Sequence, residues 1–270
     1  MDAAAIALVL AAAGLHASWN LRLHEVEDRV GVLAASGLVI GAALAVFVAR
    51  QPPLEVWPSV VVSGVAETVY GLALAGAYAR GDLAATYPVG RGTAPLLVTV
   101  GGWALLSQAP SGAAIAGAAC LAAGLIALAL RSRRARMLRA SGLALVVGLA
   151  IATYSLADAR AIAAGASPLA YLGTTMCLQG VLTLAVLRVD LARVRRALRA
   201  GAQVAVGSAG AYALILVAFS LAPAGRVATL REVSVLIALV AARRRSGERT
   251  GRLGWVGAGL VVAGAVLAAR

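Results

Sequence analysis

The sequence contains no lysine, only two histidines and two cysteines, and few charged residues of any kind. All 24 basic residues are arginine, and charged residues make up 13% of the 270 positions against 61% hydrophobic residues and a mean hydropathy of +0.91. A soluble domain has roughly 45–50% apolar and about 25% charged residues, so this composition indicates a membrane protein with many spanning helices. Each membrane helix needs about 20 apolar residues. Ten such helices with short loops would use the whole chain and leave no room for a soluble domain.

The scarcity of histidine and cysteine removes several classes of site. His16 and His24 show no metal-ligand spacing, and no Ser/His/Asp set or phosphate-binding glycine loop is present. Cys120 and Cys177 lie in apolar segments, where we expect buried thiols and no disulfide. The sequence therefore predicts neither an enzyme nor a bound metal or cofactor.

The net charge of +13 does not indicate nucleic acid, because the arginines are unevenly placed. When loops are counted alternately along ten helices, one side of the membrane collects eighteen arginines, and fifteen of them lie in 131–139, 188–199 and 243–252. The other side collects four, and two lie within helices. This positive-inside bias predicts both termini outside, in what we expect to be a bacterial cytoplasmic (inner) membrane. The start MDAAA lacks the positive region of a signal peptide, so we expect an uncleaved first helix.

The chain divides almost in half at the basic linker 131–140. We expect a first five-helix repeat over 1–130 and a second over 141–270. At an offset of 140, Gly117 and Gly124 align with Gly257 and Gly264, and Arg91 aligns with Arg231. A rival offset of 135 matches PVGR at 88–91 to PAGR at 223–226. We prefer 140, because it aligns both the glycines and the two intramembrane arginines. Boundaries of the ten expected helices are about 3–21, 30–49, 56–79, 83–106, 111–130, 141–161, 167–187, 201–221, 224–242 and 252–269.

The fold class we predict is an all-α membrane protein with two inverted five-helix repeats. Five helices per repeat is an odd number, so the second repeat must insert upside down relative to the first. Inverted repeats give many secondary transporters two interchangeable conformations around a site near the membrane midplane. The spacing Gly37-x-x-x-Gly41 in the second helix predicts close helix packing.

Four ionisable residues fall inside the predicted spans: Glu67, Arg91, Arg231 and Glu232. A charge at a helix centre costs about 2.5–3.5 kcal/mol on insertion scales, so these residues should face the interior and find partners. Glu67 and Arg91 flank the turn near Gly81 at similar depth, which predicts a direct pair or a substrate shared between them. Arg231 and Glu232 point about 100° apart, so each needs another partner. The alternative is that these charges only fix helix register.

The stretch GDLAATYPVGRGTAP at 81–95 places Tyr87, Arg91 and Pro95 on one helical face. Pro88 and Pro95 each remove a backbone hydrogen bond, so we expect a bend there beside a polar cavity. Asp158 is near a predicted helix end, where we expect it to be solvated.

This block, together with GLHASWN in the first helix, Glu67-x-x-Tyr70 and TLREVSVL at 229–236, resembles the EamA-type drug/metabolite transporter superfamily. The resemblance implies ten helices around a central cavity and movement of small metabolites, often outward. It also implies that the third, fourth, eighth and ninth helices line the cavity. It does not fix a substrate.

We therefore expect a secondary transporter that exports a small metabolite by alternating access, with or without proton coupling, as a monomer or homodimer in the lipid bilayer. A carrier or flippase of a lipid-linked group and a non-transporting membrane assembly partner are the alternatives. Arg91 and Arg231 would hold an anionic group, and Glu67 or Glu232 would couple transport to charge. The candidate substrate-binding residues are His16, Trp19, Glu67, Tyr70, Tyr87, Arg91, Arg231, Glu232 and Ser234.

Overall fold

The structure, a computed structural model, describes residues 1–79, 83–129, 140–237, 240 and 252–270, without the side chains of 77–79, 83–88, 129, 140 and 141. Within these ranges every regular element is a helix. The elements are α1 (Ala3–Glu25), α2 (Arg29–Ala43), α3 (Ala45–Arg50), α4 (Trp57–Ala79), α5 (Leu83–Leu106), α6 (Gly112–Ala129), α7 (Ala140–Ala163), α8 (Pro168–Leu187), α9 (Leu191–Leu221), α10 (Ala224–Arg231) and α12 (Arg252–Ala269).

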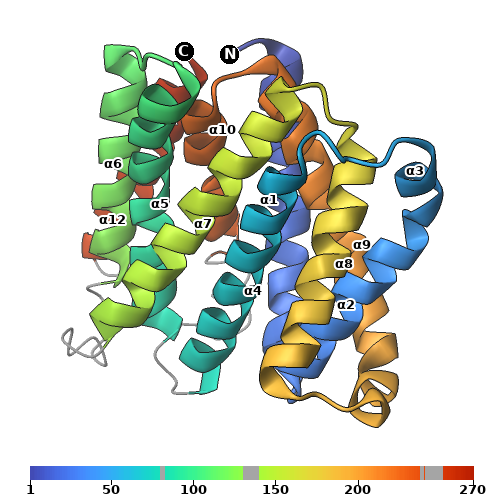
Figure 1. Cartoon of the computed structure of the whole chain (residues 1–270). Helices are drawn as coiled ribbons and strands as arrows, with labels where there is room; N and C mark the ends of the chain where they lie inside the picture. Colours follow the sequence, from blue (N-terminus) through green and yellow to red (C-terminus); the bar gives the residue numbers. More distant parts are fainter. Residues whose placement is uncertain (80–82, 130–139, 238–239, 241–251) are drawn as a thin grey trace.

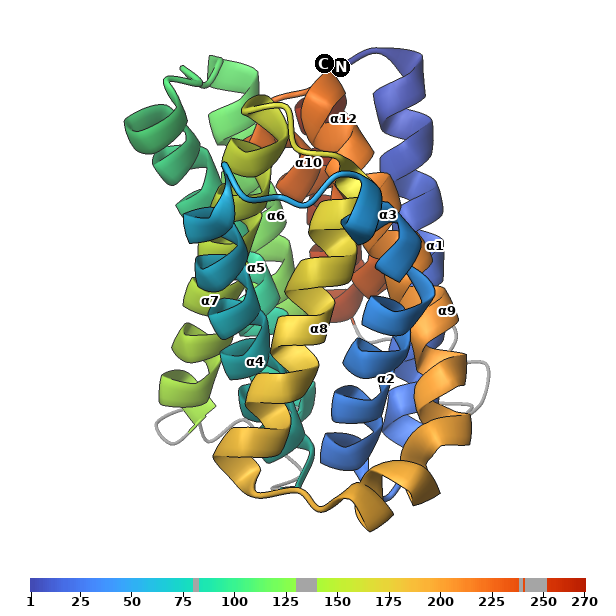
Figure 2. The same cartoon turned by 45° about the vertical axis from the view of Figure 1, so that its right-hand side comes forward.

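Most of the long helices run along one common direction, so the molecule has two ends (Figures 1 and 2). Both chain termini lie at the same end, where the amino group of Met1 donates to the carbonyl of Ala269 at 2.7 Å. The connection between α8 and α9 and the first turns of α9, which carry several of the arginines, lie at the opposite end (Figure 2). The charge asymmetry in the sequence is therefore also an asymmetry between the two ends of the described structure.

Six helices of the described structure are long and apolar enough to cross a membrane, and two shorter helices are also apolar. Side chains such as Val206 and Trp255, which are 78% and 66% exposed, form an apolar outer surface. Such a surface suits hydrocarbon rather than water, so the chain is an integral membrane protein. The expected total of ten spans stays a prediction. The six spans are Ala3–Glu25, Trp57–Gly76, Gly142–Ala163, Pro168–Leu187, Leu191–Leu221 and Arg252–Ala269, and the shorter helices are Arg29–Ala43 and Gly112–Leu128.

Three segments differ from the sequence prediction by more than a shift of a few residues at a helix end. The helix expected over 30–49 is divided at Leu44 into α2 and α3. The segment 188–200, expected as a loop, is largely helical, because Asp190 caps α9 by accepting from the backbone N–H of Arg193 at 2.5 Å. The helix expected over 224–242 is interrupted by a turn at Glu232, after which 233–237 are again helical.

Glycines allow two pairs of helices to approach closely. A Cβ on Gly117 would lie 2.9 Å from the carbonyl oxygen of Gly264, and a Cβ on Gly124 would lie 2.7 Å from that of Gly257, so α6 and α12 pack backbone against backbone. Gly37 meets α8 in the same way, with the Met176 carbonyl 2.6 Å from the position of a Cβ. The packing role predicted for the small-residue spacing in α2 is confirmed.

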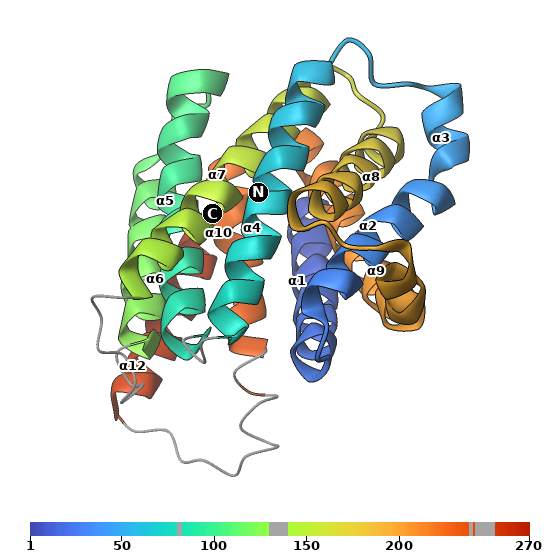
Figure 3. The same ribbon diagram turned by 60° about the horizontal axis from the view of Figure 1, so that its bottom comes forward.

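Around the centre of the molecule, α1 and α2 pack against α9, while α4 packs against α7 and α8. α5 packs against α6, α7 and α10 on the other flank (Figure 3). The helices of the first half therefore interleave with those of the second.

Candidate functional site

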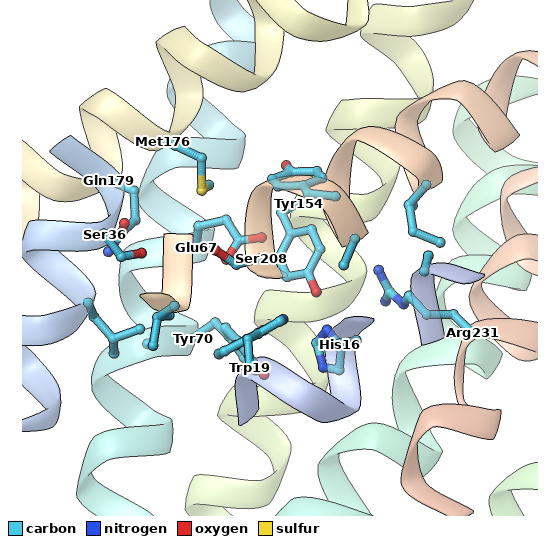
Figure 4. A pocket seen from close by; sticks show the side chains of 17 residues that line it. His16, Trp19, Ser36, Glu67, Tyr70, Tyr154, Met176, Gln179, Ser208 and Arg231 are labelled. Atoms are coloured by element: carbon cyan, nitrogen blue, oxygen red, sulfur yellow. The ribbon is translucent and has the colours of Figure 1, made fainter. Parts of the chain in front are cut away.

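A cavity of about 90 Å³ lies between seven helices, α1, α2, α4, α7, α8, α9 and α10 (Figure 4). Apolar side chains form part of its wall, among them Leu33, Met176, Val204 and Ile215. Its polar lining residues are His16, Trp19, Ser36, Glu67, Tyr70, Tyr154, Gln179, Ser208, Tyr212 and Arg231. The wall thus combines apolar surface with convergent polar groups, which is the usual character of a small-molecule site.

Glu67 is the carboxylate on this wall. It lies near the middle of α4 and is half-buried, and it forms neither an ion pair nor a hydrogen bond with any residue that the structure describes. A carboxylate in such a place is costly unless a proton or a cation meets it. Glu67 is therefore the group of the cavity with the greatest unused capacity to bind.

Arg231 ends α10 and lies on the wall of the same cavity with only 6% of its surface exposed. Its one hydrogen bond within the described structure is a long one, from Nη2 to the Ser155 hydroxyl at 3.5 Å, and its buried Nε has no hydrogen-bond partner. The guanidinium carbon also lies 5.7 Å from the ring centre of Tyr154. The nearest carboxylate oxygen, Oε1 of Glu232, is 3.8 Å from Nε. This guanidinium has donors left to bind an anionic group.

Beside the cavity lies a group that we call the Arg91 cluster, composed of His16, Arg91, Glu232 and Ser234. Arg91 is fully buried, and its Nε donates to Oε2 of Glu232 at 2.6 Å. Its Nη1 lies 2.8 Å from Nε2 of His16, and its Nη2 donates to the Ser234 hydroxyl at 3.1 Å. Because a guanidinium only donates, His16 must offer the lone pair of Nε2 and carry its proton on Nδ1. The turn after α10 brings Glu232 and Ser234 to this position.

Of the two alternatives predicted for Glu67 and Arg91, the direct pair is wrong, and a substrate shared between them stays a prediction. The depth argument placed the two residues at similar levels, but depth along the membrane does not specify which way a side chain points. Arg91 faces α10 and takes Glu232 as its partner. Arg231 and Glu232 were each predicted to need another partner. Glu232 has one, Arg91. Nε of Arg231 lies 3.8 Å from Oε1 of Glu232, so the two neighbours are not fully separated.

Asp158 was expected to be solvated, and this prediction is also wrong. The residue is 0% exposed and accepts hydrogen bonds from the hydroxyls of Ser63 at 2.6 Å, Tyr171 at 2.9 Å and Tyr212 at 2.6 Å. α7 continues to Ala163, so Asp158 stands more than a turn inside the helix rather than at its end. Three hydroxyl donors replace the water that the carboxylate loses on burial.

Aromatic rings connect these groups. The ring of Tyr154 lies 6.2 Å from that of Tyr70 and 6.4 Å from that of Tyr212, and both contacts are steeply inclined. On the opposite wall the ring of Trp19 meets His16 edge-on, with centroids 4.9 Å apart. Their faces and edges can hold the apolar or cationic part of a bound molecule.

The predicted site residues fall into two groups. His16, Trp19, Glu67, Tyr70 and Arg231 lie on the cavity wall, and His16 belongs to the Arg91 cluster as well. Arg91, Glu232 and Ser234 lie in that cluster and do not line the cavity. The Tyr87 side chain lies outside the described residues.

Sequence reasoning did not select Asp158, Tyr154, Gln179 or Tyr212 as site residues. A signal was present for one pair, since Tyr154 and Asp158 are spaced i, i+4 on one helical face. The helices that line the cavity also differ from those implied by the resemblance: α4, α9 and α10 contribute as expected, no described residue of α5 does, and α1, α2, α7 and α8 join them.

The chain is similar to a solved structure and, in part, to a known protein family. One solved crystal structure, whose description names no function, matches with a TM-score of 0.75 at 16% identity, over 99% of this chain and 97% of the other. At that identity the likeness concerns the fold alone, and it extends over both halves. No curated protein matches the chain. Residues 138–270 match the model of the EamA-like transporter family, which confirms the resemblance over this C-terminal part of the chain.

Proposed function

We propose that the protein is a secondary transporter that exports a small metabolite by alternating access through the central cavity. The observation that carries this proposal is the position of Glu67, a carboxylate without an ion pair on the wall of a cavity enclosed by helices of both halves of the chain. A residue that only fixed helix register would be expected to have a partner. The family match supports a transporter of small substrates.

The helix contacts support the inverted repeat that alternating access requires. At the offset of 140, a two-fold operation exchanges Gly117 with Gly257 and Gly124 with Gly264. The two observed contacts, Gly117 with Gly264 and Gly124 with Gly257, are images of each other under this operation. The same operation converts the packing of α1 on α9 into that of α4 on α7, and both are extensive. We therefore propose two inverted repeats, 1–130 and 141–270.

The interruption at Glu232 favours this interpretation further. Transporter sites often form where a helix is broken near the middle of the membrane, because the break frees backbone groups and lets side chains turn inward. Here Arg231 and Glu232 stand at such a break and face different neighbours. We propose that both termini face the outside of a bacterial inner membrane, with the arginine-rich end in the cytoplasm.

Blocking the cavity tests the proposal. Purified protein is reconstituted into liposomes loaded with a defined panel of small amino acids, amines, carboxylates and sugars, and the efflux of each solute is measured by mass spectrometry. Ser208 lies on the cavity wall, so Ser208→Trp should abolish the efflux shown by the wild type. Val206, on the same helix, is 78% exposed, so Val206→Trp should preserve it. Equal efflux from the two variants, or wild-type efflux no greater than that of protein-free liposomes, would refute the proposal.

A further inference from the structure

The interior of the described structure does not balance its charges. It contains three carboxylates (Glu67, Asp158 and Glu232) against two guanidinium groups (Arg91 and Arg231). Asp158 is held by hydroxyl groups, and Glu232 is paired with Arg91. Glu67 and Arg231 therefore remain as the two charged groups of this set, one of each sign, whose hydrogen-bonding capacity is least used.

Arg231, which has the opposite charge, also has unused hydrogen-bonding capacity. Its nearest carboxylate, Glu232, already binds Arg91 through Oε2 at 2.6 Å, and the Oε1 atom that faces Arg231 is 3.8 Å away with no hydrogen bond of its own. Two guanidinium groups thus share one carboxylate at this end of the cavity. A buried Nε without a hydrogen-bond partner marks a donor that is not yet used.

The two unsatisfied groups are kept apart by an aromatic ring. Arg231 lies against Tyr154 at 5.7 Å, Tyr154 meets Tyr70 at 6.2 Å, and Glu67 is one helical turn from Tyr70 on α4. In Figure 4 Glu67 and Arg231 stand on either side of Tyr154. No ion pair joins the two groups in the described structure, although both line one cavity.

We propose that the cavity binds a small zwitterion whose ammonium group meets Glu67 and whose anionic group meets Arg231, with a short apolar body between them. The inference rests on the proposed function, since it names the class of solute that the transporter would carry. A molecule with one charge would leave the other end unsatisfied, at the cost of a buried, unpaired charge. A molecule whose charges are adjacent would not reach both ends around the ring of Tyr154.

Binding of four defined compounds to the purified protein tests this inference by titration calorimetry at pH 7. The compounds are 6-aminohexanoate, with charges at opposite ends, hexylamine and hexanoate, with one charge each, and leucine, with adjacent charges. We expect 6-aminohexanoate to bind at least about tenfold more tightly than the other three, equivalent to ~1.4 kcal/mol. Tighter or equal binding of any other compound, or no binding of all four, would overturn the inference.

A variant pair connects this preference to Glu67. In Glu67→Gln the advantage of 6-aminohexanoate over hexanoate should disappear, because the group that meets the ammonium has lost its charge. In Glu55→Gln, which changes an exposed glutamate outside the cavity, the advantage should remain. A preference that survives Glu67→Gln would contradict the assignment. Failure here is distinct from failure of the transport proposal, because cavity-dependent efflux of another solute in the liposome panel would leave that proposal intact.

Discussion

The Arg91 cluster and the cavity lie side by side and use the same chemical groups, yet they differ in how completely those groups are satisfied. In the cluster a fully buried guanidinium has a carboxylate, a histidine and a hydroxyl as partners, at 2.6, 2.8 and 3.1 Å. On the cavity wall Glu67 has no ion pair in the described structure, and Arg231 has one long hydrogen bond. A saturated buried charge stabilises helix packing, whereas an unsaturated one keeps its capacity for a ligand. From this contrast we propose a structural role for Arg91 and a binding role for Glu67.

The largest expected effect on stability comes from a substitution in the Arg91 cluster. Arg91→Ala removes one partner of a buried ion pair and leaves the Glu232 carboxylate without its guanidinium, so the free energy of unfolding should fall by about 3–5 kcal/mol. Thermal unfolding of the purified protein measures this. Unfolding close to that of the wild type would mean that the cluster is not structural.

The second prediction tests whether Asp158, like Arg91, is a buried charge that stabilises the fold. Asp158→Ala deprives three hydroxyl groups of their acceptor, and we expect a loss of about 3 kcal/mol in the free energy of unfolding. Tyr171→Phe removes only one of those hydrogen bonds and should cost about 1.5 kcal/mol. If both variants unfold like the wild type, the carboxylate is not held as the structure describes.

A surface pair gives a smaller effect that depends on pH. Asp28 receives two hydrogen bonds from Arg193, at 2.8 and 2.7 Å, and this contact lowers the pKa of the Asp28 carboxyl below its ordinary value of 3.8. A depressed pKa adds stability that is complete above the unfolded-state value and is lost as the pH falls through the folded-state value. Because both side chains are more than a third exposed, we expect about 1 kcal/mol or less. The difference in unfolding temperature between pH 6 and pH 3 should be smaller in Asp28→Asn than in the wild type, and an equal difference would exclude the contribution.

The smallest effect on stability is expected at Glu67. Its carboxylate has no ion pair to lose in the described structure, so Glu67→Gln should unfold within about 1 kcal/mol of the wild type, as substitutions away from such pairs usually do. A loss as large as that of Arg91→Ala would place Glu67 in a structural network and remove the contrast between the two regions.

Much of the fold follows from the sequence, because apolar runs and their breaks locate helices well. The expected bounds of the helices at 83–106 and 252–269 are those of α5 and α12. The errors arise where tertiary contacts override local pattern. Arg193 pairs with Asp28, at the start of α2, and lies within the helical part of a segment expected to be a loop.

The site was less predictable than the fold. Sequence reasoning singled out Glu67, Arg91, Arg231 and Glu232, because any charge inside an apolar run is unusual. It did not determine their partners, since a partner depends on which faces two helices turn towards each other. Arg91 pairs with Glu232, 141 positions away in the sequence, and not with Glu67. Asp158 was overlooked because its hydroxyl donors come from three different helices, α4, α8 and α9.

The most direct test of the account is the efflux activity of Glu67→Gln in the liposome panel, compared with Glu55→Gln and the wild type. The account predicts that Glu67→Gln loses efflux of the solute that the wild type exports fastest while keeping its unfolding temperature, and that Glu55→Gln keeps both. Wild-type efflux from Glu67→Gln would contradict the account, because the unsatisfied carboxylate would then have no part in transport.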